Sequence, residues 1–341
     1  MAVTSNERSA LAAEISEHKH EIASYATDQT LKAAYWDLRY GEMGRVSCFN
    51  DNLKNIEVFS LAVRNNSPMI AETHVLWLRD LHINLGMCTT FVAQAFTHMQ
   101  TAAAEILSPD AASALKLVLD RSKNAMVYTD PLCREITKHQ DAIVEVVVNA
   151  MYTSIPYWRV RYGDTGRAAC GIDTYYNVNY LVDALGRDNT KGILIHTAWM
   201  RDFLISRGMC SEYYITAWSV LADAIVAVIP VQYHDRIRKL VQLVIDNMRY
   251  KADFEGLILN QRDTILDQVA ARVYDGSPGL KLRFTRHDYS QDMHYRLSYL
   301  VDAVCQDQRE IITDYLNWTR GVLPHLSLTL SEFDAGLAAL A

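Results

Sequence analysis

The amino-acid sequence reads YWRVRYGDTGRAACGID at residues 157–173, and 122 residues earlier it reads YWDLRYGEMGRVSCFND at residues 35–51. The same offset relates HTAWMRD at 196–202 to HVLWLRD at 74–80, and GMC at 208–210 to GMC at 86–88. Because every pair shares one offset, the two copies align without a gap. We therefore interpret the chain as a tandem repeat.

A third, more diverged copy follows the second. The segment YLVDA at 180–184 returns 119 residues later at 299–303, whereas Leu282 and Thr285 replace the two glycines of the first motif. The pattern predicts three tandem helical-bundle repeats, at residues 7–127, 128–251 and 254–341, packed into one array.

Long stretches without helix breakers predict an all-α fold. The 341 residues include seven prolines and 14 glycines, and no segment alternates as a strand would. We expect helices in the first repeat at 8–32, 51–63, 69–85, 89–107 and 111–124, with a tight connection across the glycine motif. Gly86 suits a helix C-terminal cap. The second repeat should follow the same plan at 132–152, 173–185, 190–207, 211–229 and 231–250.

Composition limits the classes of function. The formal net charge is −7 and no basic cluster stands out, which argues against nucleic-acid binding. Residues 1–16 lack the apolar core of an export signal, so we expect a cytoplasmic protein with reduced thiols. Residues 213–230 are nearly all apolar, but they include Asp223 and are short for a span of roughly 20 residues. We predict a buried core helix there and no membrane segment.

The motif Tyr-Gly-x-x-Gly-Arg is the most specific local signal. A guanidinium fork at Arg45 or Arg167 can clamp a carboxylate or phosphate through two parallel hydrogen bonds. This favours an anion clamp for a ligand. The alternative is structural, with each arginine paired to Asp51 or Asp173 or capping a helix.

Histidine and aromatic residues recur together. His74 precedes Trp77 by three residues, and His196 precedes Trp199 likewise, so each pair shares one helix face. Such a histidine can bind a tetrapyrrole metal or a chromophore, or it can be a core histidine with its ring nitrogens satisfied. The repeated aromatic residues, which include Tyr40 and Tyr162, suit either a pocket for a flat conjugated ligand or helix–helix interfaces.

Other polar residues give weaker indications. We expect Arg79 and its repeat partner Arg201, each followed by an aspartate, to form either ion pairs on helix surfaces or contacts between repeats. Glu14, with His18 and Glu21, has metal-ligand spacing, but the other repeats lack a matching set, so we predict no metal site. Cysteines at the repeat-equivalent positions 48 and 170 are either chromophore attachment points or small buried residues. No arrangement identifies catalytic residues.

Short apolar motifs give a resemblance. YLVDA at 299–303 followed by DYLNW at 314–318 resembles the small helical modules of bacterial sensory and regulatory proteins. The resemblance also includes a glycine–arginine pair followed by an aspartate. This pattern occurs at residues 44–51, where it ends with Asp51, and at residues 166–173, where it ends with Asp173. The resemblance implies a helical sensor or ligand-binding module, with no ligand named and no catalytic residue transferred.

Together these patterns predict a binding or regulatory protein. It would hold an aromatic or tetrapyrrole-like small molecule, or a partner helix, at a site formed by His74, Trp77, His196, Trp199, Arg45, Arg167, Tyr40 and Tyr162. The cofactor is unknown, and a homo-oligomer is compatible with the repeats. Two alternatives stay open: a metal- or cofactor-dependent biosynthetic enzyme on a duplicated helical scaffold, and a structural repeat scaffold.

Overall fold

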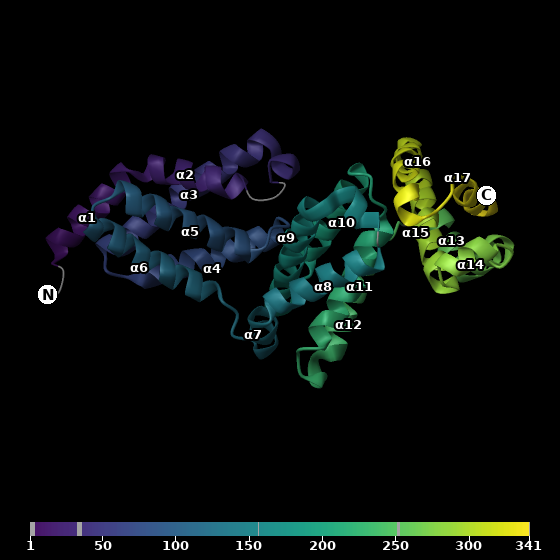
Figure 1. The fold of residues 1–341 in the computed structure, drawn as a ribbon. Coiled ribbons are helices and arrows are strands. Elements are labelled where there is room, and N and C mark those ends of the chain that lie inside the picture. The colour runs from purple at the N-terminus through teal and green to yellow at the C-terminus, as the bar shows by residue number, and fades with distance from the viewer. Residues whose placement is uncertain (1–3, 33–35, 156, 251–252, 341) are drawn as a thin grey trace. The chain divides into compact units, whose positions relative to one another are not determined.

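The computed structural model describes residues 4–32, 36–155, 157–250 and 253–340. The described residues contain helices joined by short connections and no strand, which confirms the predicted all-α fold (Figure 1). The elements are α1 (Ser5–Glu17), α2 (Lys19–Leu31), α3 (Trp36–Arg64), α4 (Pro68–Asn84), α5 (Thr89–Ile106), α6 (Pro109–Met126), α7 (Pro131–Lys138), α8 (Gln140–Ser154), α9 (Tyr157–Arg187), α10 (Lys191–Ser206), α11 (Ser211–Val226), η1 (Val231–Tyr233), α12 (His234–Met248), α13 (Asp253–Val269), η2 (Ala270–Tyr274), α14 (Pro278–Arg283), α15 (Arg286–Cys305), α16 (Glu310–Val322), η3 (Leu323–Leu326) and α17 (Leu330–Leu340).

Contacts divide the chain into two compact units. The N-terminal unit comprises Met1–Thr137 and Tyr176–Ile193, and the C-terminal unit comprises Lys138–Tyr175 and Leu194–Ala341. Helix α9 therefore contributes residues to both. These units are defined by contacts and not by sequence likeness, so the three repeat boundaries stay a prediction.

Each unit has its own core. In the N-terminal unit, α2 packs against α3 and α5, while α6 packs against α4 and α5 (Figure 1). Phe59 and Phe96 are fully buried there, with their rings 5.1 Å apart. In the C-terminal unit, α11 packs against α8, α12 and α15, and Trp218 of α11 is fully buried. Apolar helix faces supply both cores, as the helical periodicity predicts.

Helix α11 is the apolar segment that was expected to be a core helix. Most of its side chains are buried, among them Tyr213 and Leu221. Among the described residues, no helix is both long and apolar enough to cross a membrane.

The first expected helix of the first repeat and that of the second were both wrong. The predicted helix 132–152 is two helices, α7 and α8, separated at His139 (φ −100°, ψ 8°). The predicted helix 8–32 is two helices, α1 and α2, separated at His18, whose φ of −91° and ψ of 9° leave the helical region.

The glycine motif does contain the expected tight connection: the backbone leaves the helical conformation at Gly41 (φ 59°, ψ −158°), so α3 consists of two helical segments joined by a kink. Helix α9 bends in the same way at Gly163 (φ 57°, ψ −153°). Only glycine adopts this backbone conformation without strain, so the motif encodes a bent helix.

Gly86 is the cap that the sequence predicts. It follows the last residues of α4 with a φ of 82°, and its amide donates to the carbonyl of Ile83, while that of Met87 donates to His82. This pair of bonds is the Schellman arrangement, which closes a helix at a left-handed residue. Gly208, at the equivalent place in the second copy, has a φ of 77°.

We expect Gly41→Ala to lower the free energy of unfolding by about 1–3 kcal/mol, because alanine is strained in this backbone conformation. No atom lies within 4 Å of the added Cβ, so the loss would come from the backbone and not from a clash. Denaturant unfolding measures it. Gly256→Ala is the matched control: its Cβ also meets nothing within 4 Å, but its helical backbone accepts alanine, with a gain of up to about 1 kcal/mol. Equal changes in the two variants would contradict this account.

A buried aspartate closes a hydrogen-bond cluster in each unit. Asp183 of α9 accepts from the backbone amide of Thr89 (2.7 Å), from the Thr89 hydroxyl (2.6 Å) and from the hydroxyl of Tyr128 (2.8 Å). Three residues earlier on α9, Tyr180 donates to the carbonyl of Gly86 at 2.9 Å. We call this set the first aspartate junction.

The second aspartate junction repeats it at equivalent positions. Asp302 of α15 accepts from the amide and hydroxyl of Ser211 (2.7 Å each) and from the hydroxyl of Tyr250 (2.9 Å). Tyr299 donates to the carbonyl of Gly208 at 2.9 Å. The repeated sequence therefore encodes a repeated helix–helix connection, and it explains why Tyr-x-x-Asp recurs at 180–183 and 299–302.

The junctions make stability depend on pH. Burial raises the pKa of Asp302 from 3.8 to about 6, although its hydrogen bonds from Ser211 oppose that rise. An acid with a raised folded-state pKa contributes stability below the unfolded pKa and loses it as the pH rises through the folded pKa. We therefore expect wild type to lose about 3 kcal/mol relative to Asp302→Asn between about pH 4 and pH 7. Denaturant unfolding of both proteins across this range measures the difference in their free energies of unfolding. Both proteins contain the same histidines, so the contribution of histidine titration cancels in this difference. A difference that does not change with pH would contradict the prediction.

Candidate functional site

A cavity of about 400 Å³ lies within the N-terminal unit, among α2, α3, α4 and α5. We call it the first cavity. Its apolar walls include Trp36, Leu78 and Phe91. The Trp36 ring stacks on Tyr40 with centroids 5.2 Å apart and meets the edge of Phe91. A concave, aromatic-walled space of this size is typical of small-molecule sites, which span about 300–1,000 Å³.

Polar groups with unused hydrogen-bonding capacity line the first cavity. The indole nitrogen of Trp36 and the hydroxyl of Tyr40 are buried and have no partner among the described residues. Burial raises the pKa of Tyr40, so the phenol stays protonated. A buried donor without an acceptor is unfavourable by about 1–3 kcal/mol. Two residues that line the cavity therefore carry donors without an acceptor in the described part of the chain.

Acceptors lie in the same lining. His82 donates from Nδ1 to the carbonyl of Leu78 at 2.8 Å, and burial lowers its pKa. The neutral ring then has an acceptor at Nε2. The Asp51 carboxylate also lines the cavity. The site thus combines donors and acceptors with flat apolar walls.

Cys48 lines the first cavity as a thiol. Asn52 Nδ2 lies 3.7 Å from its sulfur, and burial raises its pKa. A thiol held neutral is a poor nucleophile. All six cysteines are thiols and not disulfides, as predicted. Of the two expectations for Cys48, the structure favours the small, partly buried residue over the attachment point.

A second cavity, of about 440 Å³, lies within the C-terminal unit beside the first turns of α15. The two repeat offsets align lining residues of the first cavity with lining residues of the second: Ser47 with Asp288, Cys48 with Tyr289, Asp51 with Asp292, Asn55 with Arg296, Met87 with Leu328 and Phe91 with Glu332. The cavities are therefore equivalent in the repeat, yet the second has charged residues where the first has uncharged ones.

The second copy of the repeat has a large side chain where the first copy has its cavity. Tyr152 aligns with Thr30, a lining residue of the first cavity. It is buried, its ring meets the edge of Trp158 with centroids 5.5 Å apart, and its hydroxyl lies 3.0 Å from the position of a Cβ on Gly166. Trp158 and Gly166 align with Trp36 and Gly44 of the first cavity. Tyr152 thus occupies space that Thr30 leaves open.

The predicted site residues lie at separate places. Tyr40 lines the first cavity. His74 is outside this lining but donates from Nε2 to Oδ1 of the lining residue Asn55 at 2.7 Å, and burial lowers its pKa. The side chain of Trp77 is 59% exposed and lines neither cavity, so its role in binding stays a prediction. The rings of His74 and Trp77 are 5.9 Å apart, so the two residues share one face of α4 as predicted.

Their equivalents in the C-terminal unit have the following surroundings. His196 is 1% exposed, and Trp199 stacks on Phe203 with ring centroids 5.0 Å apart. Tyr162 has a buried hydroxyl with no partner among the described residues, and burial raises its pKa to about 12. None of the three lines the second cavity.

The two motif arginines make surface interactions. Arg45 donates to Oδ1 of Asp28 at 2.7 Å, with both side chains partly exposed, so its partner is not the expected Asp51. Arg167 donates to Oδ1 of Asn149 and lies over the ring of Tyr152, 5.5 Å from its centroid. Neither lines a cavity. The anion clamp therefore stays a prediction without a cavity beside it.

Arg79 and Arg201 form the expected ion pairs, with Asp80 at 3.5 Å and Asp202 at 2.8 Å, but Arg79 is 6% exposed and not a surface residue. It donates to the carbonyl of Met126 at 3.2 Å, and Arg201 donates to the carbonyl of Met248 at 2.8 Å. Each arginine thereby satisfies a carbonyl at a helix end, where no helical partner is available. Sequence spacing gave no sign of these distant carbonyls.

Glu14 and Tyr35 complete the placements. Glu14, considered as a metal ligand or catalytic group, accepts from the amide (2.6 Å) and hydroxyl (2.8 Å) of Ser108. Ser108 in turn caps α6, so the carboxylate stabilises a helix start. Tyr35, part of the repeated motif, lies outside the described residues.

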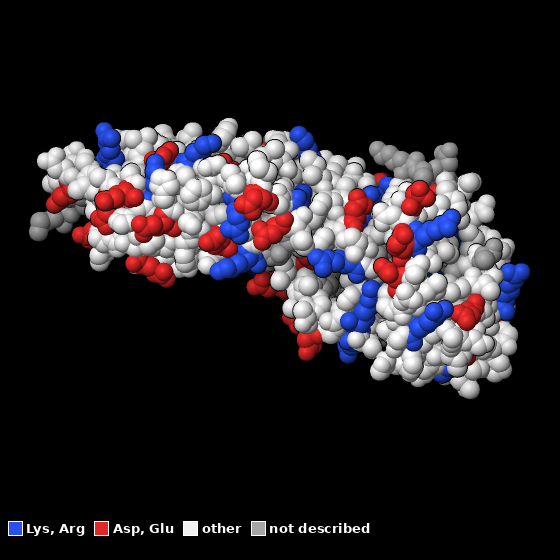
Figure 2. Space-filling view, turned by 90° about the horizontal axis from the view of Figure 1, so that it is seen from above, with Lys and Arg blue, Asp and Glu red and all other residues white. Residues whose placement is uncertain are grey.

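Charged side chains are interspersed on the molecular face shown in Figure 2. Lysine and arginine side chains alternate there with aspartate and glutamate, and no area of this face is covered by basic side chains alone. The expectation that the protein does not bind nucleic acid stays a prediction.

One family model matches part of the chain. Residues 1–126 match the family described as phycobilisome protein. No curated protein and no solved structure matches the chain. The matched region contains every residue that lines the first cavity, which extends from Thr30 to Ala95. The predicted resemblance to sensory modules is not tested by this match.

Proposed function

We propose that the N-terminal unit is a carrier for a linear tetrapyrrole, which it holds in the first cavity. The phycobilisome protein family binds bilin chromophores, and the family match covers the whole cavity lining. The observation that carries the proposal is the lining itself: flat apolar walls with two buried donors, on Trp36 and Tyr40, that have no partner among the described residues.

The lining residues fit the chemistry of such a ligand. A linear tetrapyrrole has terminal carbonyl oxygens and ring N–H groups. Trp36 and Tyr40 would donate to oxygens, while Asp51 and Nε2 of His82 would accept from N–H groups. Leu78 and Phe91 would cover the ring faces. The bound group would supply absorption of visible light.

The state of the thiol indicates how the ligand is held. Cys48 is neutral because burial raises its pKa, and thioether formation requires the thiolate. We therefore propose reversible binding without a covalent bond. The carboxylates that natural tetrapyrroles carry would point to solvent, since no lysine or arginine lines the first cavity among the described residues.

Titration with biliverdin tests the proposal. The full-length protein is purified from a host that makes no bilin, and biliverdin is added while visible circular dichroism and tryptophan fluorescence are recorded. We expect an induced dichroism band and quenched fluorescence that saturate at one biliverdin per chain. Denaturant should then release all the pigment. Absence of both signals would overturn the proposal, and pigment retained after denaturation would overturn the reversible mode.

A further inference from the structure

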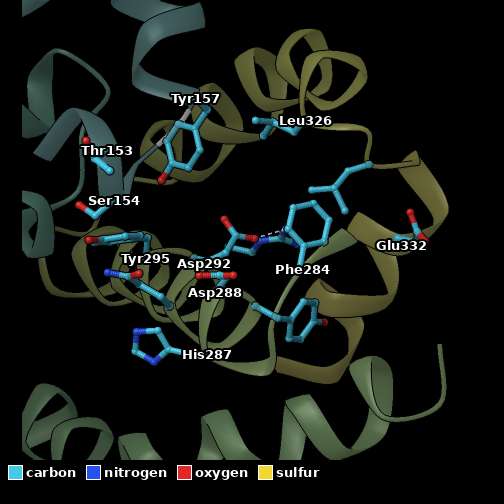
Figure 3. Close-up of a pocket in the computed structure, with 14 residues that line it drawn as sticks. Thr153, Ser154, Tyr157, Phe284, His287, Asp288, Asp292, Tyr295, Leu326 and Glu332 are labelled. Atoms are coloured by element: carbon cyan, nitrogen blue, oxygen red, sulfur yellow. Dashed lines mark hydrogen bonds and ion pairs between the residues drawn. The ribbon is translucent and has the colours of Figure 1, made fainter. Parts of the chain in front are cut away.

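The second cavity differs from the first in charge. Asp288 and Asp292 of α15 project toward its middle, with the aromatic rings of Tyr157, Phe284 and Tyr295 around them (Figure 3). The aromatic rings provide flat apolar walls like those of the first cavity, but the polar groups are largely acidic. The chemical class of ligand must therefore be argued separately.

The acidic groups that line the cavity differ in their ion pairs. Arg296 is 3% exposed and forms an ion pair with Asp292, so these two charges offset each other. Glu332 pairs with Arg283 in the same way. Asp288 has only the neutral Thr285 as a hydrogen-bond partner, and those bonds lower its pKa, so it is ionised at neutral pH. Of the three carboxylates that line the cavity, Asp288 is the one outside these ion pairs; it is exposed, and His287 beside it also lines the cavity.

Two buried donors belong to residues that line the same cavity. The hydroxyl of Tyr289, a residue 6% exposed, and Nε of Arg296 have no hydrogen-bond partner among the described residues. They lie seven positions apart on α15 and therefore on one helix face. Since Asp292 already neutralises Arg296, a second anion here would bury excess negative charge. A neutral oxygen acceptor fits these donors better.

We propose that the second cavity binds an organic monocation with a flat aromatic body and a neutral oxygen acceptor, as in a hydroxyaryl alkylamine. The ammonium group would lie near Asp288, the ring between the aromatic walls, and the oxygen at Tyr289 and Arg296. This site is distinct from the tetrapyrrole site and lies entirely in the C-terminal unit.

Calorimetric titration of the full-length protein with three matched probes tests the proposal. Tyramine has the ring, ammonium and oxygen; phenethylamine lacks the oxygen; 3-(4-hydroxyphenyl)propionate replaces the ammonium by a carboxylate. We expect tyramine to bind at one per chain, phenethylamine to bind about tenfold more weakly because the buried donors stay unsatisfied, and the propionate not to bind. Equal binding of tyramine and the propionate, or binding of neither amine, would overturn the proposal.

The variant Tyr289→Phe tests whether the hydroxyl of Tyr289 donates to the oxygen of the ligand. The hydroxyl has no partner to lose, so the variant should fold as wild type does, which far-ultraviolet circular dichroism checks. Its preference for tyramine over phenethylamine should fall several-fold, while phenethylamine binding stays unchanged. An unchanged preference would contradict the assigned contact. Thr30→Tyr, altered only in the first cavity, should bind tyramine as wild type does, so this result is independent of biliverdin binding.

Discussion

Thr30→Tyr should abolish biliverdin binding, with a loss of at least about 100-fold in affinity, or about 2.7 kcal/mol. The substitution copies the second copy of the repeat, where Tyr152 occupies the place of Thr30. Its phenol would fill space between Trp36 and Gly44, as Tyr152 does between Trp158 and Gly166. The biliverdin titration of circular dichroism and fluorescence measures the effect.

Thr30→Val is the matched control for this prediction. Valine has nearly the volume of threonine, and the buried Thr30 hydroxyl has no partner among the described residues. The variant should therefore keep the cavity, bind biliverdin as wild type does, and be as stable as wild type or slightly more so. Full binding by Thr30→Tyr, or equal loss in both variants, would show that biliverdin binds elsewhere.

Asp183→Ala should be the most destabilising single change in the N-terminal unit among those considered, lowering the free energy of unfolding by about 3 kcal/mol. It would leave the Thr89 amide, the Thr89 hydroxyl and the Tyr128 hydroxyl without their acceptor. Each buried unsatisfied donor is unfavourable by about 1–3 kcal/mol. Burial raises the pKa of Asp183, which shows that the charged carboxylate is disfavoured in the folded protein. Removing that carboxylate therefore offsets part of the loss in stability.

Denaturant unfolding with Thr89→Ser as the control tests the junction. The second junction uses Ser211 at the position equivalent to Thr89, with the same two bonds to its aspartate. Serine at 89 should therefore keep the junction and change the stability by less than about 1 kcal/mol. If Asp183→Ala also changed the stability by less than that, the junction would not hold α9 in place.

The sequence was sufficient to predict the all-α fold because helix periodicity and breakers are local properties. It also located the Gly86 cap, since only a left-handed glycine suits the position after α4. The two glycines of the first motif also indicated the connection at Gly41, but residue types alone do not show that it is a single kink within α3.

The candidate site was less predictable. Tyr40 was identified through its repeated motif, but the first cavity also needs Thr30, His82 and Phe91, which come from three other helices. Their convergence is a tertiary property. One difference visible in the sequence does relate to the cavity. The repeat-equivalent positions 30 and 152 hold a threonine and a tyrosine, which differ in volume. The small residue lines the first cavity, and the large residue fills the equivalent space in the second copy.

The aspartate junctions also bear on how the chain avoids uncontrolled self-association. The hydroxyl donor of Tyr180 and the carboxylate acceptor of Asp183 have Val58 and Leu61 as equivalents in the first copy, and Thr89 has Leu330 in the third. The first copy therefore lacks the Tyr-x-x-Asp pair, and the third copy lacks the hydroxyl donor that such a pair would bind. Head-to-tail contacts of this kind do not close on themselves and extend into fibres. We therefore expect this connection to form within one molecule and not between separate chains.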